Sequence, residues 1–158
     1  MNKIFWCLIL APFFCVAQNV DLKLLHEKIG TSFRGLSMVN DEIAWLGGSG
    51  GTIGKTENGG ANWNWIKPTG YEKLDFRSIK AFDASHAIAV NAGAPAYILN
   101  TNDGGKTWSE TYKNLDTAIF LDGISFWDKK NGLVFGDPIN HSLQLLKTTD
   151  GGNHWEDI

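Results

Sequence analysis

Cysteine is almost absent from this sequence of 158 residues. The two cysteines, Cys7 and Cys15, both fall near the start of the chain, in a segment that we expect to be removed. The remaining chain can therefore form neither a disulfide bond nor a metal site built from thiolates.

The chain also lacks an excess of positive charge. It has 14 Lys and Arg against 17 Asp and Glu, so it has no general attraction for nucleic acid or for anionic lipid. Gly47 to Gly51 is glycine-rich, but neither a Lys-Ser/Thr pair nor a helix follows it, which argues against a nucleotide-binding loop. The histidines lack the spacing of metal ligands; they are His26, His86, His141 and His154. We expect no metal, no cofactor and no nucleic-acid partner.

The first 17 residues have the layout of a secretory signal peptide. Lys3 precedes an apolar run from Ile4 to Val16, and the small residue Ala17 follows it. The run is shorter than the roughly 20 apolar residues of a membrane-spanning helix, and Phe14 before Cys15 argues against lipid attachment. We predict a signal peptide at 1–17 and a mature chain at 18–158, exported to the periplasm or beyond and not held in a membrane after cleavage.

A repeated segment is the strongest signal in the mature chain. Thr-Asn-Asp-Gly-Gly-Lys-Thr-Trp ends at Trp108, and similar segments end at Trp63 and Trp155, 45 residues before it and 47 after it. Phe33–Val39, Phe76–Phe82 and Leu121–Trp127 form a second set of similar segments with nearly the same period. That period matches a four-stranded propeller blade.

Short alternating runs between turn residues predict strands in each unit. The units span about 33–66, 76–112 and 121–158. The predicted strands are Phe33–Val39, Ile43–Leu46, Thr52–Lys55 and Trp63–Ile66; Phe76–Phe82, Ala87–Val90, Tyr97–Asn100 and Trp108–Tyr112; and Gly123–Trp127, Leu133–Phe135, Leu143–Lys147 and a strand beginning at Trp155. The fold class is therefore all-β, a propeller of four-stranded antiparallel blades.

Turn chemistry explains the residues of the repeated segment. A short polar side chain accepts bonds from turn N–H groups, glycine permits positive φ, and tryptophan brings a large ring to the edge of the sheet. We assign a structural role to Thr56, Asn58, Gly60, Trp63, Thr101, Asp103, Gly105, Thr107, Trp108, Thr148, Asp150, Gly152 and Trp155. Trp63 and Trp108 are expected to be equivalent and largely buried. Strand position favours packing within blades for Trp45, Trp65 and Trp127, and the alternative is that one or two of them are exposed for carbohydrate stacking.

The three segments resemble the Asp-box, or BNR repeat, whose pattern is Ser/Thr-x-Asp-x-Gly-x-Thr-Trp. The copy that ends at Trp108 fits fully, whereas Asn58 and Asn62 depart from the pattern in the first copy and His154 in the third. The segments around Phe33 and Phe135 look most like bacterial exported proteins similar to the photosystem II stability and assembly factor. This resemblance implies a β-propeller in the sialidase-like superfamily.

Three units are fewer than the roughly four to eight blades of a closed propeller. We therefore expect this sequence to be a fragment, the N-terminal part of a larger ring. Residues 20–28 precede the first unit, where an outer strand that completes the last blade would lie.

Arg34, Arg77 and Asp122 occupy equivalent places at the start of the first strand of their units. The first strand of a blade lines the central channel, so these charges are expected to converge at its mouth. Two arginines there would bind a carboxylate or phosphate, unless Asp122 pairs with them and the group is purely structural.

Two functions remain open from the sequence. The first is a non-catalytic scaffold that binds a protein or a glycan. The alternative is a glycoside hydrolase of sialidase type, which needs two carboxylates or a tyrosine activated by a carboxylate. Asp75 is the best-placed acid, but no spacing selects a pair among Glu42, Asp75, Asp122 and Asp137, so the catalytic residues are unknown.

Overall fold

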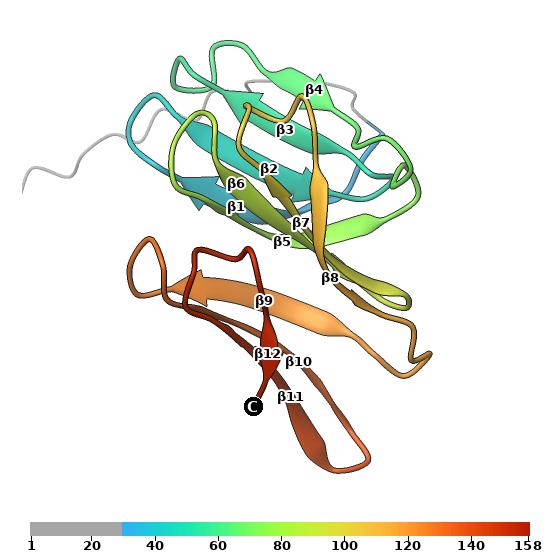
Figure 1. Cartoon of the computed structure of the whole chain (residues 1–158). Coiled ribbons are helices and arrows are strands. Elements are labelled where there is room, and N and C mark those ends of the chain that lie inside the picture. Colours follow the sequence, from blue (N-terminus) through green and yellow to red (C-terminus); the bar gives the residue numbers. More distant parts are fainter. Residues whose placement is uncertain (1–29) are drawn as a thin grey trace, which may run out of the picture.

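The computed structural model describes residues 30–158, which form three four-stranded antiparallel sheets (Figure 1). The predicted signal peptide at 1–17 and the predicted ring-closing strand at 20–28 lie outside the described residues. Blade 1 contains β1 (Phe33–Met38), β2 (Ala44–Gly48), β3 (Ile53–Thr56) and β4 (Asn64–Ile66). Blade 2 contains β5 (Asp75–Ala81), β6 (Ala87–Ala92), β7 (Ala96–Thr101) and β8 (Ser109–Asn114). Blade 3 contains β9 (Leu121–Phe126), β10 (Gly132–Ile139), β11 (Ser142–Thr148) and β12 (Glu156–Asp157).

The all-β class and the four-stranded units are confirmed, with differences at strand ends. Trp63 and Trp108 lie just before β4 and β8 rather than inside them. Strand β10 is longer than predicted, because its hairpin with β11 continues beyond Gly136, the last residue that pairs with β9. The glycine-rich segment forms the turn between β2 and β3, with positive φ at Gly50 and Gly51.

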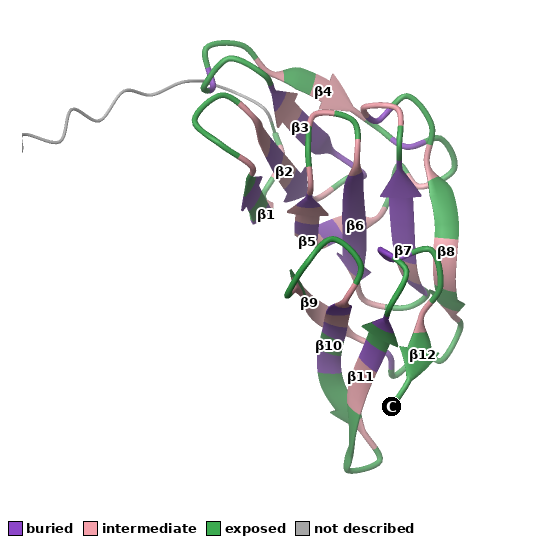
Figure 2. Ribbon diagram, turned by 60° about the vertical axis from the view of Figure 1, so that its left-hand side comes forward, coloured by how far each residue is buried: buried purple, intermediate pink, exposed green. Residues whose placement is uncertain are grey.

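The first strands of the three blades lie along one edge of the stack. Strands β1, β5 and β9 are neighbours, and β4, β8 and β12 form the opposite edge (Figure 2). Hydroxyl groups join the inner strands: Ser37 Oγ accepts a bond from Ala81 N at 2.9 Å, and Ser78 Oγ accepts one from Ile124 N at 3.2 Å. The N-terminal ends of β1, β5 and β9 therefore lie together at one end of the stack, and their C-terminal ends lie together at the other.

Strand alternation in blade 2 builds the core on both of its faces. Ala87 and Ala89 belong to a cluster with Trp45 of blade 1, whereas Ile88 and Val90 belong to a cluster with residues of blade 3. Successive side chains of a strand point to opposite faces of the sheet. The middle blade is consequently the most deeply buried part of the stack.

Candidate functional site

Each Asp-box holds a tight turn through its own side chains. In blade 2, Thr101 Oγ1 accepts a bond from Gly105 N at 3.0 Å and donates to Asp103 Oδ1 at 2.9 Å. Asp103 also accepts from Thr107 N at 2.9 Å and from Thr107 Oγ1 at 2.6 Å. The bonds from Thr107, side chain first and then backbone, lower the pKa of Asp103 to about 2. The carboxylate is thus engaged within the turn.

The other two boxes make the same turn with different residues. In blade 1 the Asn58 amide oxygen accepts from Asn62 N at 2.9 Å, as Asp103 does from Thr107 N. In blade 3 Asp150 Oδ2 contacts His154 Nδ1 at 2.6 Å. Burial raises the pKa of Asp150, but the bonds from His154 and Thr148 outweigh it and bring the pKa to about 2. Each departure from the repeat pattern therefore keeps an oxygen acceptor in the turn.

The tryptophans of blades 1 and 2 differ in their surroundings. Trp63 and Trp108 are half-buried, and Trp45, outside the motif, is fully buried. Trp108 meets Trp45 edge to face, whereas Trp63 stacks on Trp65. Partial burial of both agrees with the expectation, but their surroundings are not equivalent, because within the described residues a preceding blade covers Trp108 and none covers Trp63.

The charged residues at the start of the inner strands share a backbone feature. Pairing of β1 with β2 skips Arg34, pairing of β5 with β6 skips Arg77, and pairing of β9 with β10 skips Asp122. Each of the three is thus the extra residue of a β-bulge, a device that re-aims a side chain. The repeat alignment did find equivalent positions, but it gave no sign of the bulges.

Ion pairs join these residues across neighbouring blades. Arg34 Nη1 donates to Asp75 Oδ2 at 2.7 Å, and Arg77 Nε lies 3.1 Å from Asp122 Oδ1. We call these four residues the Arg/Asp row. Arg77 also lies over the Phe120 ring, with its guanidinium carbon 5.4 Å from the ring centroid. The structure brings Arg77 and Asp122 together, but it gives Arg34 a partner, Asp75, that the sequence had not assigned to it.

The row is accessible from solvent. The Arg34 and Arg77 side chains are 47% and 38% exposed, and exposed ion pairs contribute little stability, roughly 0–1 kcal/mol each. Arg77 contacts Asp122 through Nε, on one side of a guanidinium group that carries five N–H donors. An acidic group of a partner can therefore reach guanidinium donors without breaking a strong internal contact.

A tyrosine–carboxylate pair joins the segment between β4 and β5 to the outer strand of blade 2. Tyr71 Oη donates to Glu110 Oε2 at 3.0 Å, and Glu110 lies on β8, the outer strand. Burial, then the bond and charge of Glu110, raise the pKa of Tyr71 to about 12. The sequence gives no sign of this pair, because Tyr71 and Glu110 are 39 residues apart and are brought together only by the fold. Glu110 is placed to accept the phenol proton, as activation of a tyrosine requires, but the pair lies at the outer strand rather than at an inner one.

Other expectations concern metals and membranes. Residues 30–158 contain no cluster of three or more His, Cys, Asp or Glu arranged to hold a metal ion. No helix in the described part of the chain is long and apolar enough to cross a membrane.

Comparison with known proteins gives a curated relative and similar solved structures. No family model matches the chain. The photosystem II assembly lipoprotein Ycf48 of Synechococcus sp. (strain CC9902) is 29% identical over 139 residues, which make up 88% of this chain and 39% of that protein.

Two solved structures share the fold. Ycf48 from Cyanidioschyzon merolae has a TM-score of 0.64 and 19% identity over 85% of this chain and 42% of that one. Ycf48 bound to a D1 peptide has a TM-score of 0.63 and 20% identity over 80% of this chain and 40% of that one. The chain thus spans about two fifths of the relatives it matches. In sequence and in fold, it is similar to part of Ycf48, an Asp-box β-propeller associated with photosystem II assembly.

Proposed function

We propose that this chain is part of an exported, non-catalytic β-propeller that binds a protein partner and serves as an assembly scaffold. The observation that carries the proposal is the similarity to Ycf48 over most of the chain, since a Ycf48 structure contains a bound D1 peptide. Export is supported by residues 1–17, which have the order of charge, apolar run and small residue found in signal peptides.

The Arg/Asp row is the surface that we assign to the partner. Its two arginines are half-exposed and carry planar donors suited to carboxylates. The row is internally balanced, with two cations and two anions, so it does not attract acidic groups from a distance. A bound peptide would instead be selected at close range, where its carboxylate competes with Asp75 or Asp122 for a guanidinium.

Peptide binding tests this assignment. Fluorescence anisotropy would measure the affinity of a labelled D1 peptide for the chain and for Arg34→Ala and Arg77→Ala. We expect each substitution to weaken binding by up to about fivefold, the equivalent of an exposed charge pair of roughly 1 kcal/mol. Lys113→Ala is the control. Lys113 is a cation on the outer strand β8, where it lies over the Tyr97 ring and not in the Arg/Asp row.

Three results would count against the proposal. They are no detectable binding, equal affinity for the arginine variants and the control, and equal binding of a peptide whose acidic groups are amidated. Urea unfolding of each variant separates a binding loss from a folding defect.

The hydrolase alternative has one observation in its favour, the Tyr71–Glu110 pair. Its weakness is the place of the pair, because Glu110 lies on the outer strand β8 rather than on an inner strand. A fluorogenic sialoside distinguishes the two functions: turnover that disappears in Tyr71→Phe would support the hydrolase, and absence of turnover in the unchanged chain would leave it without support.

A further inference from the structure

Two Asn-Gly pairs occur in the chain, Asn58-Gly59 in the blade 1 Asp-box and Asn131-Gly132 at the start of β10. In such a pair no side chain shields the glycine nitrogen, which is therefore able to attack the neighbouring side-chain amide and close an imide ring. Asn58 and Gly59 are exposed, whereas Gly132 is buried. The fold thus places the same reactive dipeptide in two different environments.

The exposure of Asn58 belongs to the turn itself. Asp150 has the equivalent place in blade 3, whose Asp-box turn packs on Ile88 of blade 2, and the Asp150 side chain is 40% exposed. Asp103 in blade 2 is also partly exposed, although blade 1 precedes it. A neighbouring blade in front of this turn therefore leaves the side chain at this position accessible to water.

The side-chain amide of Asn58 is hydrogen-bonded at its oxygen. Oδ1 accepts a bond from Asn62 N at 2.9 Å and one from Thr56 Oγ1 at 3.1 Å. Both donors draw electron density from Cγ and favour attack on it, as donors aimed at a developing oxyanion do in acyl transfer. Within residues 30–158 the amide nitrogen Nδ2 has no hydrogen-bond partner, so the departing nitrogen passes directly into solvent.

One contact opposes the attack and controls its rate. Gly59 N donates to Glu42 O at 2.9 Å, and the nitrogen must lose this proton before it bonds to carbon. The contact lies in an exposed turn, and local openings of such turns cost much less free energy than the opening of core strands. The charge of the neighbouring Glu57 is balanced by Lys55, whose Nζ lies 2.5 Å from Glu57 Oε1.

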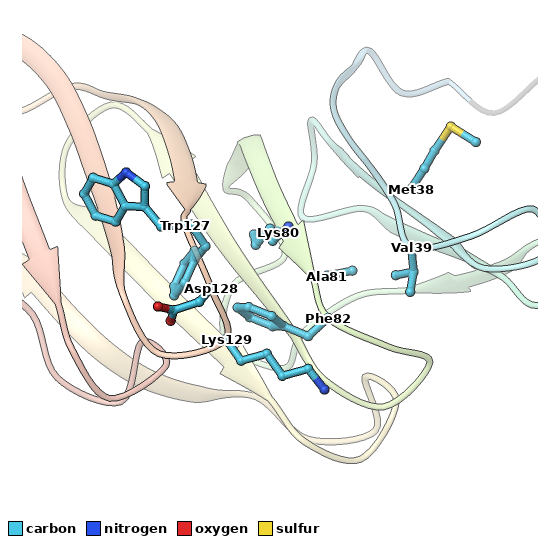
Figure 3. A pocket seen from close by; sticks show the side chains of 9 residues that line it. Met38, Val39, Lys80, Ala81, Phe82, Trp127, Asp128 and Lys129 are labelled. Carbon is cyan, nitrogen blue, oxygen red and sulfur yellow. The ribbon is translucent and has the colours of Figure 1, made fainter.

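The pair Asn131-Gly132 is held closed. Asn131 Nδ2 donates to Asp128 Oδ2 at 2.8 Å, and the charge of this carboxylate opposes the negative charge that develops during attack. Figure 3 shows Asp128 in the turn after β9, next to Trp127 and Lys129. Gly132 is buried in β10, which pairs with β9 on one side and with β11 on the other. Ring closure at this pair therefore requires the sheet to open.

We propose that Asn58 is a site of spontaneous deamidation, which converts the Asn form of the blade 1 Asp-box to the Asp form. Gly59 N bonds to Asn58 Cγ as the bond from Cγ to Nδ2 breaks, and the proton lost from Gly59 N leaves with Nδ2 as ammonia. Water then opens the imide ring: addition at Cγ gives aspartate, and addition at the backbone carbonyl carbon gives isoaspartate. The reaction consumes only water, and the site is independent of the partner surface in the Arg/Asp row.

The products add a negative charge to blade 1. Aspartate at position 58 keeps the acceptor that Asn62 N and Thr56 Oγ1 use, as Asp103 does in blade 2, so the turn accommodates it. Isoaspartate lengthens the backbone by a methylene group and displaces this acceptor. Deamidation therefore makes the blade 1 turn sensitive to acid in one product and loosens it in the other.

Peptide mapping by mass spectrometry tests the site in the folded chain. The chain is held in mildly alkaline, heavy-oxygen water, and loss of the amide with uptake of the heavy oxygen is measured at Asn58 and at Asn131. We expect the initial rate at Asn58 to exceed that at Asn131 by about tenfold or more, since Asn131 reacts only when the sheet opens. In urea, where neither environment persists, the two pairs should react at similar rates.

Asn58→Gln and Asn131→Gln are the matched variants, because glutamine keeps the amide but closes a larger ring that forms more slowly. The first should abolish the modification at position 58, and the second should leave the rate at Asn58 unchanged; urea unfolding checks that both variants are folded. Equal rates at the two pairs in the folded chain, a difference that persists in urea, or aspartate without isoaspartate at position 58 would overturn the proposal.

Discussion

Blades 1 and 2 contain the same motif and the same bulge but have different surroundings. Blade 2 lies between two other blades, and residues Ala87 to Val90 of its second strand are fully buried (Figure 2). Blade 1 is covered on one face by blade 2, and on its other face Leu36 is largely exposed to solvent. The repeat therefore sets the path of the backbone, while the neighbouring blade decides how much each side chain is buried.

Trp45 should be the most costly side chain to remove, because both blades depend on it. It is fully buried in the core shared by blades 1 and 2, and its Nε1 donates to Asp83 O at 3.1 Å. Trp45→Ala should lower the free energy of unfolding by roughly 3–5 kcal/mol, the usual cost of a large buried side chain. Urea unfolding measures this change, and a loss below about 1 kcal/mol would mean that the two blades are not held together here.

Gly105 is the point where the blade 2 turn packs on blade 1. Its φ is +87°, and a Cβ there would lie 2.6 Å from Ile66 Cδ1. Gly105→Ala should cost about 2–3 kcal/mol from the unfavourable φ and the contact together. Gly50→Ala is the matched control, because Gly50 also has positive φ but has open space around it. Equal losses would assign the effect to backbone strain alone.

The Asp-box tryptophans of blades 1 and 2, Trp63 and Trp108, test the comparison of these blades directly. Trp108 packs edge to face on Trp45 and donates to Gly105 O at 3.2 Å, whereas Trp63 stacks on its own blade's Trp65. Both are half-buried, so each should cost less than Trp45: about 2 kcal/mol for Trp108→Ala and about 1 kcal/mol for Trp63→Ala. The order matters more than the values, and a larger loss at Trp63 in urea unfolding would contradict it.

The sequence contained enough information to predict the strands but not their packing partners. A period of about 45 residues and glycine turns locate four strands in each unit, since these are local features. The Arg34–Asp75 pair was missed because it depends on how far one inner strand is shifted against the next. Exposure of Trp127 was missed because a local pattern does not show which face a neighbouring blade covers. Phe82 has the equivalent place after β5 and packs on Phe126 of blade 3, whereas no blade covers Trp127 within the described residues.

The smallest expected effect is a change in the stability of the chain at acid pH. It depends on whether an Asp or an Asn accepts the hydrogen bonds of the turn. Asp103 in blade 2 has a pKa of about 2, lowered by bonds from Thr107, whereas Asn58 in blade 1 does not titrate. Because the folded-state pKa is depressed, this carboxylate contributes stability above its ordinary pKa of 3.8, and that contribution is lost as the pH falls from about 4 through about 2.

Exchanging the two residues should exchange the acid behaviour of the two turns. Asp103→Asn should be slightly less stable at neutral pH, because the bond from Thr107 Oγ1 to Asp103 Oδ2 is lost, but its stability should change less between pH 4 and pH 2 than that of the unchanged chain. Asn58→Asp should make the blade 1 turn less stable in acid, but by less than Asp103 does in blade 2. Asn62 has no hydroxyl to donate to the new carboxylate, whereas Thr107 donates one to Asp103. Urea unfolding at several pH values measures how steeply the free energy of unfolding of each variant falls with pH. If Asp103→Asn lost stability in acid as steeply as the unchanged chain, the titrating group would lie outside this turn, and the difference between the blades would come from packing alone.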